Sequence, residues 1–157
     1  MSGRKMRARS TRTTVPDGWR PWQPWKVPTI QNLPSIVDAA KEHLKNGADF
    51  LIFTGGMSVD PDDLTPAAIR QLGAEIIRYG VPSQPGNMTL VAYLGDIPVL
   101  GVPGAAIKLP TTVLDVLLPQ IFAGEKITRE DLANLADGGL CQMCQVCHWP
   151  NCTFGRY

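Results

Sequence analysis

The chain has 157 residues, of which 44% are hydrophobic, and its formal net charge is +1. These values predict a soluble globular protein with one domain that can bury a core. The sequence has no run of about 18 apolar residues and no apolar stretch after its charged N-terminus, which excludes a membrane-spanning helix and a signal peptide; the cytoplasm is the expected location.

Residues 1–34 form a leader without the periodicity of a helix or a strand. A basic tract is followed by Trp19, Trp22 and Trp25, which are spaced between prolines. This composition predicts a disordered segment. Basic and aromatic side chains also hold phosphates and stack on bases, so a nucleic-acid-binding protein that uses this leader and a cysteine-rich zinc knuckle is an alternative function.

Residues 35–124 have the pattern of an α/β domain. A helical stripe of apolar residues follows Ser35, a suitable N-cap, and stops at Gly47. The apolar run FLIFT, residues 50–54, is bounded by glycines and predicts a strand buried on both faces of a parallel sheet.

The elements after this strand continue the α/β pattern. The stretch TPAAIRQLGAEIIRYG, residues 65–80, predicts one helix with its isoleucines inward. Two short strands are expected to be joined by the turn Gly95-Asp96, and Pro119 is expected to bend or end the helix that follows. The later predicted elements are strands at 88–94 and 97–103, a helix over 111–124 and a short helix near 129–139. The predicted fold is a three-layer α/β/α domain with a mostly parallel sheet.

A glycine turn follows the strand at 50–54. Gly55 and Gly56 let the backbone approach a ligand and offer N–H groups to an anion, while Ser58, Asp63 and Thr65 add hydroxyl and carboxylate groups. Ligands of open α/β sheets bind at the carboxyl ends of the strands. An ordinary turn that caps the next helix has the same spacing, so the motif alone leaves both interpretations open.

The segment TGGMSVDPDDLTPAAI resembles the TGG segment of the molybdopterin-binding domain shared by molybdopterin adenylyltransferases and molybdopterin molybdenumtransferases. The resemblance continues through the two proline-glycine turns of QPGNMTLVAYLGDIPVLGVPGAAI and covers roughly residues 35–124. It implies that the chain binds molybdopterin, in cofactor biosynthesis or handling, with the pterin dithiolene and its phosphate across these turns. The cofactor-binding residues that the resemblance implies are Thr54, Gly55, Gly56, Ser58, Asp63, Thr65, Pro85, Gly86, Pro103 and Gly104.

Two polar positions depart from the pattern of this family. Asn87 stands where the family usually has a lysine, and Ala105-Ala106 stand where the last turn usually continues with asparagine and proline. Without the lysine a bound phosphate lacks a cation, which favours binding over catalysis and leaves open whether the chain is an enzyme. The catalytic alternative resembles a molybdopterin adenylyltransferase or molybdenumtransferase, with Asp63 holding Mg²⁺.

The leader has no counterpart of the strand, helix and strand with which the family domain usually opens. The domain is therefore predicted to be incomplete at its N-terminus, as in a truncated chain. A sheet without an early strand exposes an apolar edge or face. We expect a second copy or another protein partner to cover it, and no membrane partner.

The cysteines lie together near the C-terminus. Their spacing, C-x2-C-x2-C-x4-C, predicts a metal site formed by Cys141, Cys144, Cys147 and Cys152. An iron–sulfur cluster and zinc both suit this donor set, and His148 could replace one thiolate; a free or redox-active thiol tail is the alternative. Residues 125–157 are predicted to form a short helix and a metal-binding tail that a hinge at Gly138-Gly139 separates from the body.

Overall fold

A computed structural model of the chain describes residues 32–57, 60 and 62–156. The predicted leader therefore lies almost entirely outside the described residues. The strands are β1 (Leu51–Thr54), β2 (Glu75–Tyr79), β3 (Leu90–Leu94) and β4 (Ile97–Val102). The helices are α1 (Leu33–Lys45), α2 (Thr65–Gln71), α3 (Ala105–Lys108), α4 (Val113–Phe122) and α5 (Arg129–Asn134).

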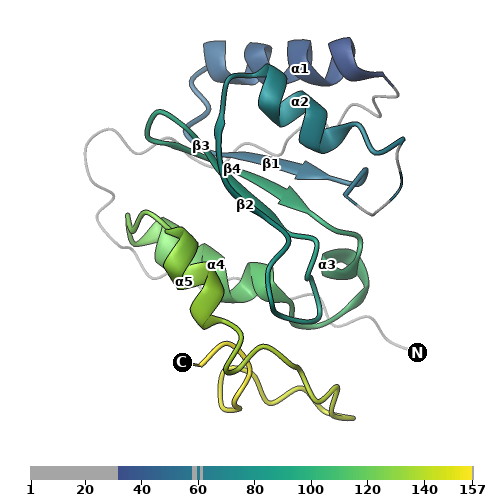
Figure 1. The fold of residues 1–157 in the computed structure, drawn as a ribbon, viewed down its shortest axis with the longest axis vertical. Coiled ribbons are helices and arrows are strands. Elements are labelled where there is room, and N and C mark those ends of the chain that lie inside the picture. Colours follow the sequence, from purple (N-terminus) through teal and green to yellow (C-terminus); the bar gives the residue numbers. More distant parts are fainter. Residues whose placement is uncertain (1–31, 58–59, 61, 157) are drawn as a thin grey trace, which may run out of the picture.

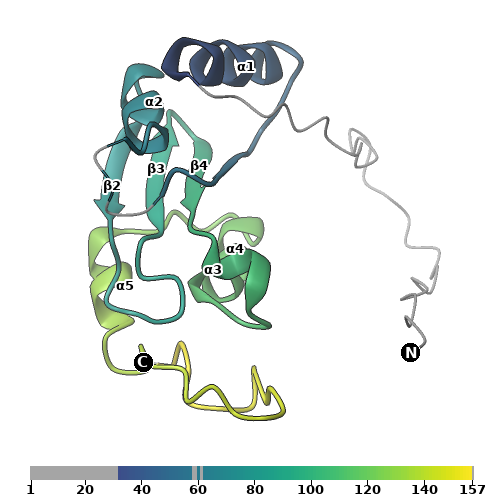
Figure 2. The same cartoon turned by 90° about the vertical axis from the view of Figure 1, so that its right-hand side faces the viewer.

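The described residues form three layers around one sheet (Figures 1 and 2). Helices α1 and α2 cover one face, and α4 and α5 cover the other. Each face has its own buried cluster, centred on Ile69 and Leu90 beneath α1 and α2, and on Leu100, Leu117 and Leu132 beneath α4 and α5. The predicted three-layer α/β/α class is confirmed. No helix in the described part of the chain is long and apolar enough to cross a membrane.

The sheet is mixed, so the prediction that it is mostly parallel was wrong. Its strand order is β1-β4-β3-β2, and of its three pairings the one between β1 and β4 is parallel. The predicted turn Gly95-Asp96 joins β3 and β4, and so short a connection can join only antiparallel strands. The tight return after β3 therefore makes β3 and β4 antiparallel, and β2, which follows a longer loop to β3, also pairs with it antiparallel.

Residues 75–79 form β2, although the sequence predicted that they continue a helix. Helix α2 ends after Gln71, and Gly73 has a φ of +84°, which a continuing helix does not allow. The isoleucines of EIIRY then alternate along a strand that pairs with β3. The helical spacing of apolar residues across the glycine was coincidental.

Strand β1 lies at an edge of the sheet, which contradicts its predicted burial on both faces. Among the described strands it pairs with β4 alone. Leu51 is buried in the cluster beneath α1 and α2, whereas Ile52, which points to the opposite face, is 43% exposed. An apolar run thus identifies a strand without giving its position in the sheet.

The helix ends follow local hydrogen bonding. The predicted N-cap Ser35 was wrong, because α1 begins at Leu33 and the Asn32 side chain accepts the N–H of Ser35 at 3.0 Å. The predicted stop at Gly47 is confirmed by its φ of +87°. Pro119 does not end α4, which continues to Phe122. The short helix predicted after it is α5.

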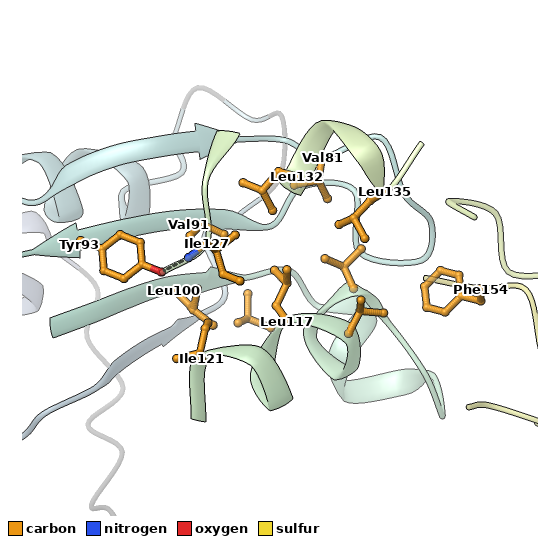
Figure 3. Packing of buried hydrophobic residues seen from close by; sticks show 13 residues of the cluster. Val81, Val91, Tyr93, Leu100, Leu117, Ile121, Ile127, Leu132, Leu135 and Phe154 are labelled. Carbon is orange, nitrogen blue, oxygen red and sulfur yellow. Dashed lines mark hydrogen bonds between the residues drawn. The ribbon is translucent and has the colours of Figure 1, made fainter. Parts of the chain in front are cut away.

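The cysteine-rich tail packs against the body, so the prediction of a hinge at Gly138-Gly139 was wrong. Both glycines are buried, and a Cβ on Gly139 would lie 2.7 Å from the Leu135 oxygen. Phe154 is 3% exposed and belongs to the same cluster as α4 and α5 (Figure 3). The tail is therefore joined to the core both before and after its cysteines.

Candidate functional site

Three of the predicted ligand-binding segments follow the carboxyl ends of strands that run in the same direction, at one end of the sheet. Strands β1, β4 and β2 run in the same direction, because β1 and β4 are parallel while β3 is antiparallel to both β4 and β2. Residues 54–56 end β1, residues 103–104 follow β4, and residues 85–86 lie in the loop from β2 to β3. The topology thus brings together segments that are far apart in the sequence, at the edge where open α/β folds bind ligands.

The glycine turn after β1 is exposed to solvent, and a hydrogen bond from the start of α2 stabilises it. Gly55 and Gly56 are exposed, with φ values of +82° and +55° that favour glycine. The hydroxyl of buried Thr65 donates to the Gly55 carbonyl oxygen at 2.8 Å. Thr65 therefore supports the turn from the start of α2, while the exposed Thr54 and the glycine backbone face solvent.

Asp63 lies near the carboxyl end of β2. Burial raises the pKa of Tyr79, the Asp63 carboxylate raises it further, and Arg70 lowers it. Asp63 is half-buried, and its amide donates to the Asp60 carbonyl oxygen at 3.1 Å. The Asp63 carboxylate thus lies close enough to Tyr79, the last residue of β2, to raise the pKa of that tyrosine. Ser58, the other polar residue predicted in this segment, lies outside the described residues.

The Pro85-Gly86 turn has a fixed backbone that includes a cis Gln84–Pro85 bond. The Pro85 carbonyl accepts the N–H of Val113 at 3.0 Å, and the Gly86 carbonyl accepts both the amide and the hydroxyl of Thr89. Gly86 has a φ of +106°, and a Cβ there would lie 3.2 Å from the Val113 nitrogen. Only glycine suits this position.

The start of α4 offers little to an anion. The Val113 amide donates to Pro85, and the Leu114 amide donates to the Thr112 hydroxyl at 3.2 Å. The Asp115 carboxylate accepts the Thr112 amide at 2.7 Å, completing a capping box. The glycine turn after β1 is therefore better placed than α4 to receive a phosphate.

The Pro103-Gly104 segment is the most open of the three. Gly104 is exposed, and a Cβ there would meet no atom within 4 Å. Exposed Lys108 ends α3, the short helix that follows. Asn87, which stands in place of the family's lysine, is also exposed. Lys108 is thus a basic residue near a predicted segment, although it does not occupy the family's lysine position.

The four cysteines line one cavity of about 150 Å³ between the tail and the body. The Thr111 hydroxyl lies 3.0 Å from the Cys147 sulfur, and the Cys141 sulfur accepts the Met143 amide at 3.4 Å. No cysteine is in a disulfide. Nowhere in the described ranges do three or more His, Cys, Asp or Glu side chains converge closely enough to hold a metal. The sulfurs share a cavity without forming a closed site.

Two contact residues of this region had no signal in the sequence. Gln84 bonds to the tail through its backbone, and Thr111 contacts Cys147 through its side chain. Neither belongs to a motif, because each depends on two segments that meet only in the folded chain. Pro85, predicted for the pterin site, also lines the cysteine cavity.

The comparisons with known proteins agree with the motifs. A family described as "Probable molybdopterin binding domain" matches residues 24–123. The chain belongs to this family. The molybdopterin molybdenumtransferase of Bacillus subtilis (strain 168) is 42% identical to this domain over 66 residues, which are 42% of this chain and 15% of that protein. A crystal structure of a molybdopterin biosynthesis MoeA protein from Pyrococcus horikosii aligns with a TM-score of 0.43 and 27% identity, over 56% of this chain and 21% of that chain. The domain thus spans a small part of each of these two proteins.

Proposed function

We propose that this chain binds molybdopterin at the carboxyl edge of its sheet and acts in the biosynthesis or handling of the molybdenum cofactor. The observation that carries the proposal is the shared edge of residues 54–56, 85–86 and 103–104. Membership in the molybdopterin-binding family supports the choice of ligand. The nucleic-acid alternative has no support from the comparisons, and most of the leader it needs lies outside the described residues.

The groups at this edge suit different parts of the ligand. Backbone N–H groups of the exposed Gly55-Gly56 turn suit a phosphate, because glycine lets an anion come close to the backbone. The Asp63 carboxylate suits the N–H donors of a pterin ring. The rigid Pro85-Gly86 turn gives the site a fixed wall. These groups bind and orient the ligand, and no catalytic step is assigned to them.

The test is a titration of the protein with molybdopterin under nitrogen, for the wild type, Asp63→Ala and the control Asp38→Ala. Asp38 is an exposed carboxylate on α1. Removing a hydrogen bond to a charged group costs roughly 1.5–3 kcal/mol, so Asp63→Ala should weaken binding about 10-fold or more. The control should bind like the wild type. An unchanged affinity of folded Asp63→Ala removes Asp63 from the site, and a wild type that does not bind overturns the function.

We propose a second function for the tail, in which Cys141, Cys144, Cys147 and Cys152 bind zinc or an iron–sulfur cluster. The donor chemistry fits, since thiolates are ligands of both and all four cysteines line one cavity. Because the sulfurs do not converge, binding requires the exposed stretch around Cys144 and Cys147 to close. A bound metal would crosslink the tail.

Metal analysis of protein purified without oxygen tests this site. We expect one zinc ion, or iron and sulfide in cluster proportion, per chain. Cys144→Ser should lower the metal content, whereas Ser35→Ala on α1 should not. Metal-free wild-type protein that takes up neither metal on reconstitution would show that the thiols are free.

We also infer that another protein chain, a second copy or a different partner, covers the β1 edge. Ile52 is 43% exposed there, and Phe122, which is 72% exposed, packs edge-to-face against Phe50 with ring centroids 5.7 Å apart. No other described strand pairs with the outer side of β1, so this edge and these side chains can contact another chain. Light scattering should show a dimer or larger species that Ile52→Lys weakens. A monomer at all concentrations excludes the second copy and leaves a different partner, which affinity capture with the wild type and Ile52→Lys would test.

A further inference from the structure

The tail forms hydrogen bonds with the loop that carries the Pro85-Gly86 turn. The Gln84 amide donates to the Gly139 carbonyl oxygen, and the Cys141 amide donates back to the Gln84 carbonyl oxygen at 2.8 Å. The Ser83 hydroxyl also donates to the Gly139 oxygen, at 3.1 Å. A β-bridge pairs Gln84 with Leu140. One predicted metal ligand, Cys141, therefore forms a backbone hydrogen bond with Gln84, the residue before Pro85.

A second set of contacts joins the cysteines to the same turn. The Cys147 sulfur contacts the Thr111 hydroxyl at 3.0 Å. Thr111 is buried and lies two positions before Val113, whose amide donates to the Pro85 carbonyl oxygen at 3.0 Å. Cys141 thus contacts the residue before Pro85, and Cys147 contacts Thr111, two positions before the residue that donates to Pro85.

The cysteine segment is anchored at both ends and exposed in the middle. Before it, Gly139 is packed so closely that a Cβ would clash with the Pro82 and Leu135 oxygens. After it, Phe154 is buried and the Gly155 amide donates to the Gly138 oxygen at 2.9 Å. Residues 142–148 are exposed between these anchors. Closure around a metal would therefore act on the anchors rather than on a free end.

We propose that metal binding by the cysteines and ligand binding at the Pro85-Gly86 turn are coupled, so that each strengthens the other. The proposal rests on the proposed function of both sites. Closure of the thiolates on a metal would restrain Cys141, whose amide donates to the Gln84 carbonyl oxygen, and Cys147, whose sulfur can still accept a hydrogen bond from the Thr111 hydroxyl. A restrained turn loses less conformational freedom when a ligand binds, which gives positive coupling. The metal at the tail thereby regulates the pterin site.

The coupling has a measurable size and is reciprocal. Coupling between two sites usually changes affinity by about 5- to 150-fold. We expect about 10-fold, because hydrogen bonds rather than a shared ligand join the two sites. Molybdopterin should strengthen zinc binding by the same factor, since the coupling free energy is common to both.

The experiment measures the molybdopterin Kd of the whole chain, reduced and under nitrogen, with one equivalent of Zn²⁺ and with a chelator. We expect about 10-fold tighter binding with zinc. Equal Kd values with and without zinc overturn the coupling and leave the proposed pterin site standing. Protein that binds molybdopterin in neither state overturns both proposals, and protein that binds no zinc overturns the coupling together with the metal site.

Hydrogen exchange gives a measurement that needs no pterin. Zn²⁺ alone should slow exchange of the Gln84 and Cys141 amides at least 5-fold, whereas the Ala68 amide, within α2, should not change. Unchanged exchange at Gln84 in zinc-loaded protein overturns the proposed route.

A variant can weaken the connection while leaving both sets of predicted ligands intact. Ser83→Ala removes one hydrogen bond to Gly139, whose oxygen keeps the Gln84 amide as a donor. It should retain the zinc content and reduce the effect of zinc on the molybdopterin Kd by half or more. Ser35→Ala, which changes an exposed serine on α1, is the matched control and should keep the full effect. A full effect in both variants would show that the Ser83 bond carries none of the coupling.

Discussion

Replacing Phe154 with alanine tests whether the tail is part of the folded body. Phe154 is 3% exposed, and its cluster includes Leu117, Leu132 and Leu135 (Figure 3). Truncating a buried phenylalanine to alanine costs about 3–5 kcal/mol, and we expect about 3 kcal/mol because Thr153 and Arg156 beside Phe154 are exposed. This is a large fraction of the roughly 5–15 kcal/mol that stabilises a typical domain.

The assay is urea unfolding and thermal unfolding, both followed by far-UV circular dichroism in reducing buffer. For a chain of this size, about 3 kcal/mol corresponds to a melting temperature lower by roughly 6–12 °C. The control is Met143→Ala, since Met143 is 67% exposed in the same tail, and its effect should stay within about 0.5 kcal/mol. If Phe154→Ala unfolds at the wild-type midpoint, the tail is separable and the packing argument fails.

Two further variants test the core and a helix cap. Gly101→Ala places a Cβ 2.6 Å from the Met57 methyl carbon and 3.2 Å from the Leu90 Cβ. The substitution should therefore lower the free energy of unfolding by about 1–3 kcal/mol, measured by thermal unfolding. A smaller loss when Met57→Ala is also present would confirm the clash, and an equal loss would refute it. Thr128→Ala removes the N-cap of α5 and should cost about 1 kcal/mol at neutral pH. Hydrogen bonds from the Thr128 side chain and amide lower the pKa of Asp131 below its ordinary value of 3.8. The cap therefore stabilises the fold fully at a pH above 3.8, and this contribution to the free energy of unfolding is lost as the pH falls through the pKa of the folded state. Urea midpoints across the acid range should therefore fall less steeply in the variant than in the wild type, and parallel curves would contradict this assignment.

Local signals in the sequence correctly predicted much of the fold. Gly47 ends α1, Gly95-Asp96 joins β3 to β4, and the short helix before the cysteines is present. These features depend on a few neighbouring residues, and for Gly47 the reason is its positive φ. The motifs that resemble the molybdopterin-binding family were likewise readable along the chain, and the family match confirms them.

The predictions from the sequence were wrong where the surroundings of a segment, rather than its local residue pattern, determine its structure. The run at 50–54 looks the same in a central strand and in the edge strand that β1 is, because its apolar character does not reveal how many neighbours it has. The apolar residues of 75–79 fit both the period of a helix and that of a strand until the backbone of Gly73 and the pairing with β3 are known. In each case hydrogen bonds to a distant segment determined the outcome.

The sequence by itself determined the chemistry that this protein carries, namely the glycine and proline-glycine turns, the Asp63 carboxylate and the four clustered thiols. Only the tertiary structure decided how these groups are placed relative to one another. Strand pairing brings the turns to one edge, and burial of Phe154 holds the tail against Gln84. The physical reason is that residue types are local properties, whereas strand order and burial depend on contacts between segments far apart in the chain.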